Sequence, residues 1–318
     1  MANNLFKKSW LLIKQTFKSF SEDKVMKLGG SLAYYTIFSM GPLLVVIISL
    51  CGIFFKRDAI ENKIYSVMQD FVGQDTAVQL QEIIRNAGIG NKGNIAAIVS
   101  IVVLIIGATS VFAEIQDSIN GIWGLKAKPQ KAWFILLRNR LLSFSVIISL
   151  GFLLLVSLTV TGIIEALNNR LKASFPDVTV VLFYVVNLII TLLVSTLIFA
   201  VIFKVLPDAK IKWKDVMIGA IVTALLFILG KFGISMYISQ TKVGSTYGAA
   251  GSLVVFIVWV YYSSIILYLG AEFTKAYAVN FGSAIYPNEY AVTTQTVEIE
   301  TGKKPVADKE ISIQKNRN

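Results

Sequence analysis

The fold is decided by the stretch from residue 216 to residue 240, which reads VMIGAIVTALLFILGKFGISMYISQ and carries one charged side chain, that of Lys231. A helix needs about 20 mainly apolar residues to cross the hydrocarbon core of a bilayer, so this stretch is long enough to span it. Five further long stretches contain no charged residue: 28–55, 95–113, 141–164, 178–203 and 243–271. The sequence therefore predicts an all-α, polytopic membrane protein with six transmembrane helices.

The composition agrees with this class. The mean hydropathy is +0.67, and only 15% of the residues are charged, which lies outside the range of soluble domains. The net charge of +11 would favour nucleic acid as a partner if it formed one basic face. The Lys and Arg residues instead alternate between the loops, so no nucleic-acid partner is expected.

The alternation of basic residues predicts the topology. Segments 1–27, 114–140, 204–215 and 272–318 together hold 21 Lys and Arg residues, against 8 in the segments between them. The positive-inside rule places the basic set in the cytoplasm, so both termini are expected there. The expected location is the plasma (inner) membrane of a bacterium, as a multi-pass protein.

The spans divide the chain into three parts. Residues 1–27 form a cytoplasmic amphipathic segment, residues 28–280 a six-span membrane domain, and residues 281–318 a flexible cytoplasmic tail. The long loop 56–94 is expected outside, with two short amphipathic helices within 58–88. The tail is rich in Thr, Glu and Lys, which bury too little surface to offset the entropy of ordering.

Aromatic and aliphatic residues follow a helical period within residues 5–20. Phe6, Trp10, Ile13, Phe17 and Phe20 recur at spacings of three and four, while lysines project elsewhere. Such a helix suits the cytoplasmic lipid interface, and packing on the underside of the helical bundle is an equal alternative.

Pro42 lies near the centre of the first span. A proline inside a helix removes one backbone hydrogen bond and clashes with the preceding turn, so a kink or break is predicted there. Interrupted helices often line the substrate site of transporters, and a kink without function is the alternative.

Lys231 is the principal candidate for substrate binding. Fifteen residues separate it from Val216, so at about 1.5 Å per residue it lies in the outer half of the membrane. A lysine at that depth is costly unless it meets a partner or a wet cavity, although its stem could snorkel to the interface. Glu165 is a candidate counter-charge, and Asn187 is a neutral alternative. Gly230 and Gly233 are predicted to leave room beside the lysine.

Other polar residues complete the predicted substrate site. A ring of tyrosines is expected to line the cytoplasmic half of a cavity between the first, fifth and sixth spans: Tyr34, Tyr35, Tyr261 and Tyr262. Glu272, at the cytoplasmic end of the last span, is either a carboxylate that titrates during transport or an interface residue that pairs with Lys275.

Enzymatic functions find little support in the residues. The chain has no His and one Cys, Cys51, and it shows no metal-ligand spacing and no Gly-rich phosphate loop. Ser235 and Lys231 lie four residues apart, but no surrounding motif supports a Ser–Lys pair. No catalytic residue, metal or other cofactor is therefore predicted.

Three stretches together resemble the YihY/BrkB family of bacterial inner-membrane proteins. They are Leu32–Ser39 with Pro42, Gln116–Trp123, and Tyr247–Gly251 running to Trp259–Tyr262 and Gly270–Glu272. Family members look like six-span helical proteins. Some bear a ribonuclease label, others a serum-resistance label, and a relative is linked to movement of lipid A precursors.

The resemblance implies transport of an amphiphilic or ionic substrate more than catalysis. The leading hypothesis is a transporter or flippase for a lipid-like or anionic amphiphile. The alternatives are a non-transporting scaffold for envelope assembly or regulation, and an ion or proton exchanger. The expected partners are membrane lipids and the substrate, and a homo-oligomer is left open.

Overall fold

The structure is a computed structural model that describes residues 2–51, 65, 78, 94–128, 145–146, 149, 176–241 and 251–294. The predicted third span at 141–164, the external helices within 58–88, Glu165 and residues 295–318 lie outside the described residues, apart from the isolated positions just given.

The described chain is mainly helical. Its helices are α1 (Ala2–Glu22), α2 (Val25–Cys51), α5 (Asn94–Ile122), α7 (Pro176–Val205), α8 (Trp213–Thr241) and α10 (Gly251–Asn280). Short strands lie between or after them: β1 (Leu125–Ala127), β2 (Ala209–Lys210), β3 (Tyr286–Pro287) and β4 (Ala291–Thr293). Five predicted spans thus fall on α2, α5, α7, α8 and α10.

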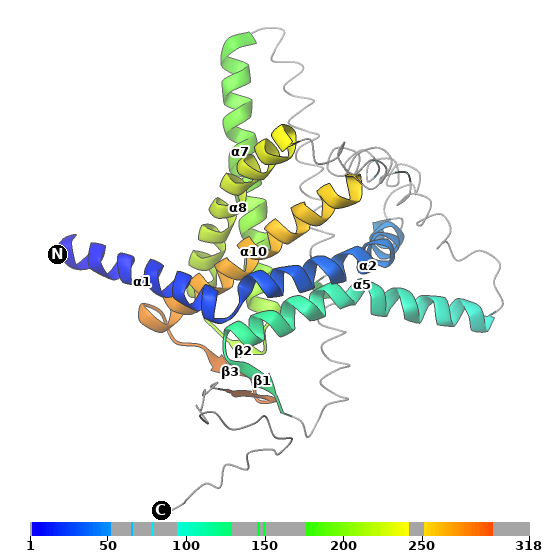
Figure 1. The fold of residues 1–318 in the computed structure, drawn as a ribbon, viewed down its shortest axis with the longest axis horizontal. Coiled ribbons are helices and arrows are strands. Elements are labelled where there is room, and N and C mark those ends of the chain that lie inside the picture. Colours follow the sequence, from blue (N-terminus) through cyan, green and yellow to red (C-terminus); the bar gives the residue numbers. More distant parts are fainter. Residues whose placement is uncertain are drawn as a thin grey trace, which may run out of the picture.

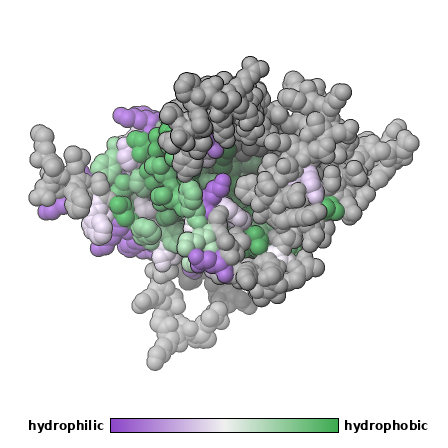
Figure 2. Space-filling model, turned by 90° about the horizontal axis from the view of Figure 1, so that it is seen from above, coloured by the Kyte–Doolittle hydropathy of each residue, from purple (hydrophilic) through white to green (hydrophobic). Residues whose placement is uncertain are grey.

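Three stretches within the described helices are long and apolar enough to cross a membrane. They are Val185–Val205, Trp213–Ile234 and Leu253–Asn280. Many of their large side chains, such as Leu193, Leu229 and Phe232, are exposed on the protein surface. Apolar surface of this extent is expected of helices that face lipid, because hydrocarbon replaces water as their solvent. Seen from above, hydrophobic side chains form a broad area with hydrophilic residues at its edge (Figure 2).

Five helices spread like a fan from a common end, and α1 extends to the other side (Figure 1): the five are α2, α5, α7, α8 and α10. Neighbouring helices contact one another in the order α5, α2, α10, α8, α7, with α10 in the middle. The common end holds the most deeply buried side chains, among them Ile119, Ile122, Phe203, Leu206 and Tyr268. The loops at this end are those that the charge count groups together as basic.

The strands connect these loops. β1 pairs with β4 and β2 pairs with β3, both antiparallel, with Lys126 opposite Val292 and Lys210 opposite Tyr286. Residues 286–287 and 291–293 are therefore part of the fold, which corrects the expectation of a flexible tail there. The strands are also a small departure from an all-α fold. Their backbone hydrogen bonds are made by loops that the helices bring together, so local composition did not predict them.

The helix α2 continues through Pro42 without a break. The proline ring lies against Gly107 of α5, where a Cβ atom would come within 2.8 Å of the ring. A missing side chain on α5 thus makes room for the proline between the two helices. The prediction of a broken first span is wrong. Pro42 removes one backbone hydrogen bond, but the helical turns before and after it are formed, so the helix does not end there.

The helix α1 has two different faces. Leu12 and Thr16 are buried where α1 packs against α10, and Asn280 of α10 donates a hydrogen bond to Gln15. Trp10 and Phe17, on the predicted apolar face, are exposed. One face therefore packs on the other helices, and the other remains available to the lipid interface.

Candidate functional site

An apolar cavity of about 510 Å³ lies between the helices of the fan. All five long helices contribute to its wall, for example through Met40 (α2), Ile115 (α5), Phe199 (α7), Phe227 (α8) and Trp259 (α10). The rings of Phe199 and Phe227 meet edge to face with their centroids 5.8 Å apart. The volume falls within the range of roughly 300–1,000 Å³ typical of ligand pockets.

The hydroxyl groups in this wall do not make it polar. Thr36, Ser263 and Ser264 line the cavity, and each donates a hydrogen bond to the carbonyl four residues earlier in its own helix, over 2.7, 2.8 and 2.6 Å. Their bonding capacity is thus largely used within the helices. The cavity offers a ligand dispersion contacts and apolar burial, which suits a hydrocarbon chain better than a sugar or a free ion.

Close packing of α8 on α10 supports one side of the cavity. Thr223 of α8 lies against Gly270 of α10, and Thr274 of α10 lies against Gly219 of α8. Each threonine hydroxyl donates to the carbonyl of the glycine four residues earlier in its own helix, over 2.7 Å. Small residues four apart on each helix let the two backbones approach closely, a common arrangement in membranes.

A buried polar cluster joins α5 to the loop after α7. Gln116 and Asn120 donate hydrogen bonds to the carboxylate of Asp208 over 3.1 and 2.9 Å. The backbone N–H of Asp208 donates to the side-chain oxygen of Asn120 over 2.8 Å. All three side chains are buried, so the carboxylate depends on these donors. The cluster fixes the common end of the fan.

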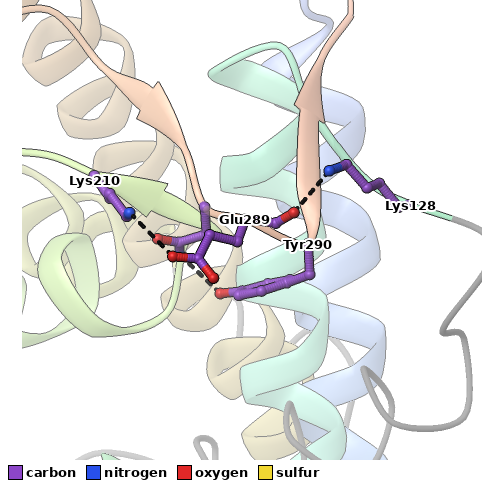
Figure 3. A network of polar contacts seen from close by, with 5 residues as sticks. Lys128, Lys210, Glu289 and Tyr290 are labelled. Carbon is purple, nitrogen blue, oxygen red and sulfur yellow. Dashed lines mark hydrogen bonds and ion pairs between the residues drawn. The ribbon is translucent and has the colours of Figure 1, made fainter.

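The turn between β3 and β4 is held from two sides (Figure 3). Lys128, just after β1, donates to the carbonyl of Glu289 over 2.7 Å. Lys210 of β2 lies 3.8 Å from the Glu289 carboxylate. Asn288 donates its backbone N–H to the carbonyl of Asp208 and its side-chain N–H to the hydroxyl of Tyr290. Two loops that are distant in sequence thus hold this turn in place.

Glu272 belongs to α10, which continues beyond it to Asn280, and its side chain is buried in the protein. Its side chain is 1% exposed, and neither carboxyl oxygen has a hydrogen-bond partner among the described residues. Lys275 instead lies 3.9 Å from Asp23 and donates to the carbonyl of Ile122. The predicted pair between Glu272 and Lys275 is therefore not formed.

Lys231 lies on an exposed part of α8 and is not among the described residues that line the apolar cavity. The adjacent Gly230 does not leave free space, because the hydroxyl of Tyr262 occupies the position where a Cβ atom would stand. That hydroxyl donates a long hydrogen bond of 3.4 Å to the carbonyl of Leu226. Gly233 does face open space among the described atoms.

The predicted ring of tyrosines divides into two groups. Tyr34 is 60% exposed, and its ring meets those of Tyr35 and Phe38 on the outside of α2. Tyr261 and Tyr262 are half-buried, and Tyr261 packs near Gly29 of α2. None of the four tyrosines is among the described residues that line the apolar cavity.

Two further predicted residues also have clear positions. The side chain of Asn187 is exposed on α7, where its backbone carbonyl accepts a hydrogen bond from Thr191. Pro42 packs against Gly107, as described above. The structure does not bring Lys231, Asn187 and the tyrosines together into one described site.

The sequence predicted a cavity between the first, fifth and sixth spans, but it did not indicate the apolar residues that line the observed cavity, and it missed the buried cluster. Gln116 and Asn120 lie four residues apart and therefore on one helical face, which is a usable signal for a polar contact. Asp208 gives no such signal, because it stands alone in a short loop between two spans.

Comparisons with known proteins place the chain among bacterial membrane proteins. The sequence profile described as Virulence factor BrkB matches residues 16–289. A UPF0761 membrane protein of Vibrio vulnificus is 28% identical over 269 residues, which cover 80% of this chain and 79% of that protein. A UPF0761 membrane protein of Pseudoalteromonas atlantica is 26% identical over 284 residues, covering 86% of this chain and 90% of that protein. No solved structure matches.

The matched range spans every contact of the buried cluster and the wall of the cavity. It begins within α1 and ends at the turn between β3 and β4, so it covers the fan and the strands at its common end. The chain therefore belongs to the BrkB family of bacterial membrane proteins.

Proposed function

We propose that this protein transports or flips a lipid-like or anionic amphiphile in the bacterial plasma (inner) membrane. The proposal includes six spans with both termini in the cytoplasm, as the distribution of Lys and Arg predicts. It includes no catalytic step and no cofactor.

The apolar cavity is the observation that carries this proposal. It is large enough for part of a hydrocarbon chain, and its hydroxyl groups are turned to their own helices. Burial of each methylene contributes about 0.8 kcal/mol, so a chain of several carbons gains substantial binding free energy in such a place. A scaffold protein has no need of such a cavity at the centre of its membrane helices.

The charged head of the substrate requires a different place. Lys231 remains the residue that we propose for it, because it is the one charge within the predicted spans. Lys231 is exposed on α8 and is not among the described residues that line the cavity, so we propose this contact outside it. The hydrocarbon chain and the charged head of the amphiphile would then be bound by different parts of the protein.

Reconstitution tests the proposal. The full chain is placed in liposomes with a lipid that carries a fluorescent label on its acyl chain, and a membrane-impermeant reductant bleaches the label on the outer leaflet. Transport predicts that the protected fraction falls below the half seen in protein-free vesicles. Unchanged protection by a correctly folded protein, over a panel of zwitterionic and anionic lipids, would favour the scaffold.

An ion or proton exchanger is the second candidate. Buried Glu272 favours it, because a carboxyl group without a hydrogen-bond partner is costly to bury as a charge. A pH-sensitive dye inside the same vesicles measures proton movement. This candidate requires that Glu272→Gln abolishes the movement, and equal rates in wild type and variant would exclude Glu272 as the coupling group.

A further inference from the structure

A second cavity, of about 460 Å³, lies at the common end of the fan and is distinct from the apolar one. It is formed by the loop that connects α7 to α8 and by the segment after α10. Its polar wall consists of Lys204, Lys210, Lys212, Ser283, Tyr286 and Asn288. Three lysines within one cavity wall suggest an anionic ligand.

The first of these lysines is held by the fold. Lys204 is half-buried, donates to the carbonyl of Ile211, and lies with its Nζ 5.6 Å from the centre of the Trp213 ring. A cation–π contact holds an ammonium group against the face of the ring and does not cancel its positive charge. Lys204 therefore contributes fixed positive charge to the cavity.

The other two lysines, Lys210 and Lys212, are exposed, and negative charge near them is weak. Lys210 lies 3.8 Å from Glu289, whose side chain is 93% exposed. The attraction within such an exposed ion pair is weak, and it is screened by salt. Lys212 has no ion-pair partner among the described residues. Both ammonium groups can turn toward a ligand at low cost.

The nearby acids are already engaged. Asp215 is buried and accepts hydrogen bonds from the N–H and the hydroxyl of Ser283, over 3.1 and 2.8 Å. The carboxylate of Asp208 is held by the two amides of α5. Neither carboxylate is among the residues that line the cavity. The described wall is therefore positive overall.

Two aromatic residues place the cavity at the level of lipid headgroups. Trp213, the first residue of α8, is 55% exposed, and Tyr286 of β3 is 61% exposed. Trp and Tyr are enriched where a membrane meets water. The apolar stretch of α7 ends at Val205 and that of α8 begins at Trp213, both close in sequence to the lysines of the cavity, so we place the cavity at the polar edge of the bilayer.

We propose that this cavity binds a phosphate group that carries at least two negative charges. Such a group is a phosphate monoester or a diphosphate, either on a lipid headgroup or on a soluble compound. Lys204, Lys210 and Lys212 supply the positive charge, and lysines bind phosphate as point charges without a fixed geometry. This proposal does not rest on the proposed transport, since the two cavities share no lining residue.

The experiment measures binding to the full chain in nanodiscs made of zwitterionic lipid. Isothermal titration calorimetry is run with water-soluble dihexanoyl phosphatidic acid and, separately, with inorganic pyrophosphate. The test variant is Lys210→Gln combined with Lys212→Gln. Each single variant, Lys210→Gln and Lys212→Gln, is measured as well, and their control is Lys214→Gln, which removes one exposed lysine that does not line the cavity.

The double variant is expected to bind about tenfold more weakly or worse, and the control to bind as wild type does. Lysine-dependent binding of phosphatidic acid alone identifies a lipid headgroup site, and lysine-dependent binding of pyrophosphate as well identifies a general phosphate site. The proposal is overturned if neither probe binds, or if the double variant and Lys214→Gln bind alike. Thermal unfolding of each variant in the same nanodiscs verifies that the fold is retained.

Discussion

Gly219 of α8 and Thr274 of α10 share one contact: a Cβ atom on Gly219 would lie 1.9 Å from the hydroxyl oxygen of Thr274. The threonine cannot simply turn away, because that hydroxyl donates to the carbonyl of Gly270. Gly270 in turn accommodates Thr223 of α8. The two helices therefore interlock through a reciprocal pair of glycines and threonines.

This contact predicts that Gly219→Ala destabilises the protein. The added methyl group overpacks a rigid contact, and the expected loss is about 1–3 kcal/mol, because the helices must move apart. Thermal unfolding in detergent measures the loss as a lower midpoint. Gly233→Ala is the control, since nothing described lies within 4 Å of its Cβ position. Equal midpoints for the two variants would refute the interlock.

The buried cluster predicts that Asn120→Ala is strongly destabilising. The substitution removes a donor to the Asp208 carboxylate and the acceptor for the Asp208 backbone N–H. A buried charged group that loses a partner costs about 1–3 kcal/mol or more. The midpoint of thermal unfolding should fall, whereas Asn187→Ala, at an exposed position, should leave it nearly unchanged. A similar midpoint for both variants would show that the cluster contributes no stability.

The apolar cavity predicts that Ser263→Phe lowers lipid movement in liposomes. The larger side chain fills space that the hydrocarbon chain needs, while Ser263→Ala should keep normal activity, because the serine hydroxyl bonds only within its own helix. The bleaching assay with the membrane-impermeant reductant, described above, compares the two variants at equal amounts of folded protein. Full activity of the Ser263→Phe variant would mean that the hydrocarbon chain of the lipid does not pass through the cavity.

The proposed headgroup contact predicts that Lys231→Met folds and inserts but loses flux of an anionic substrate. Removal of the charge leaves the anionic head without its partner, and Lys231→Arg should keep part of the flux because it keeps the charge. The same liposomes with an anionic and a zwitterionic lipid measure the difference. If Lys231→Met moves the anionic lipid as well as wild type does, the lysine only snorkels to the interface.

The proposed topology predicts which positions a membrane-impermeant thiol reagent reaches in intact cells. In a Cys51→Ser background, a single cysteine at Gly73 should be labelled from outside, and single cysteines at Lys128 or Lys210 should be labelled only after the cells are lysed. The Lys128 and Lys210 positions lie at the common end of the fan. If a cysteine at Lys128 is labelled in intact cells, the proposed orientation is wrong and this end of the protein lies outside the cell.

Much of the fold is readable from the sequence, because the signal is local. Helices occupy most of five of the predicted spans, each of which contains at most one charged residue. These helices are α2, α5, α7, α8 and α10, on the spans 28–55, 95–113, 178–203, 216–240 and 243–271. The helix before the first span follows from helical spacing, and it is confirmed. Hydrophobic length and the 3.6-residue period act within one segment, so one segment reveals them.

The candidate site depends on the tertiary structure. Gln116 and Asn120 meet Asp208 across 92 and 88 positions of sequence, and no local period encodes such a contact. The cavity exists because five helices diverge from a shared end, and the strands exist because the helices bring distant loops together. Lys231 is exposed on α8 and is not among the described residues that line the apolar cavity, which the sequence alone did not indicate. The sequence determined which segments can enter a membrane, through the free energy of transfer of each one, and only packing between segments decided which side chains meet.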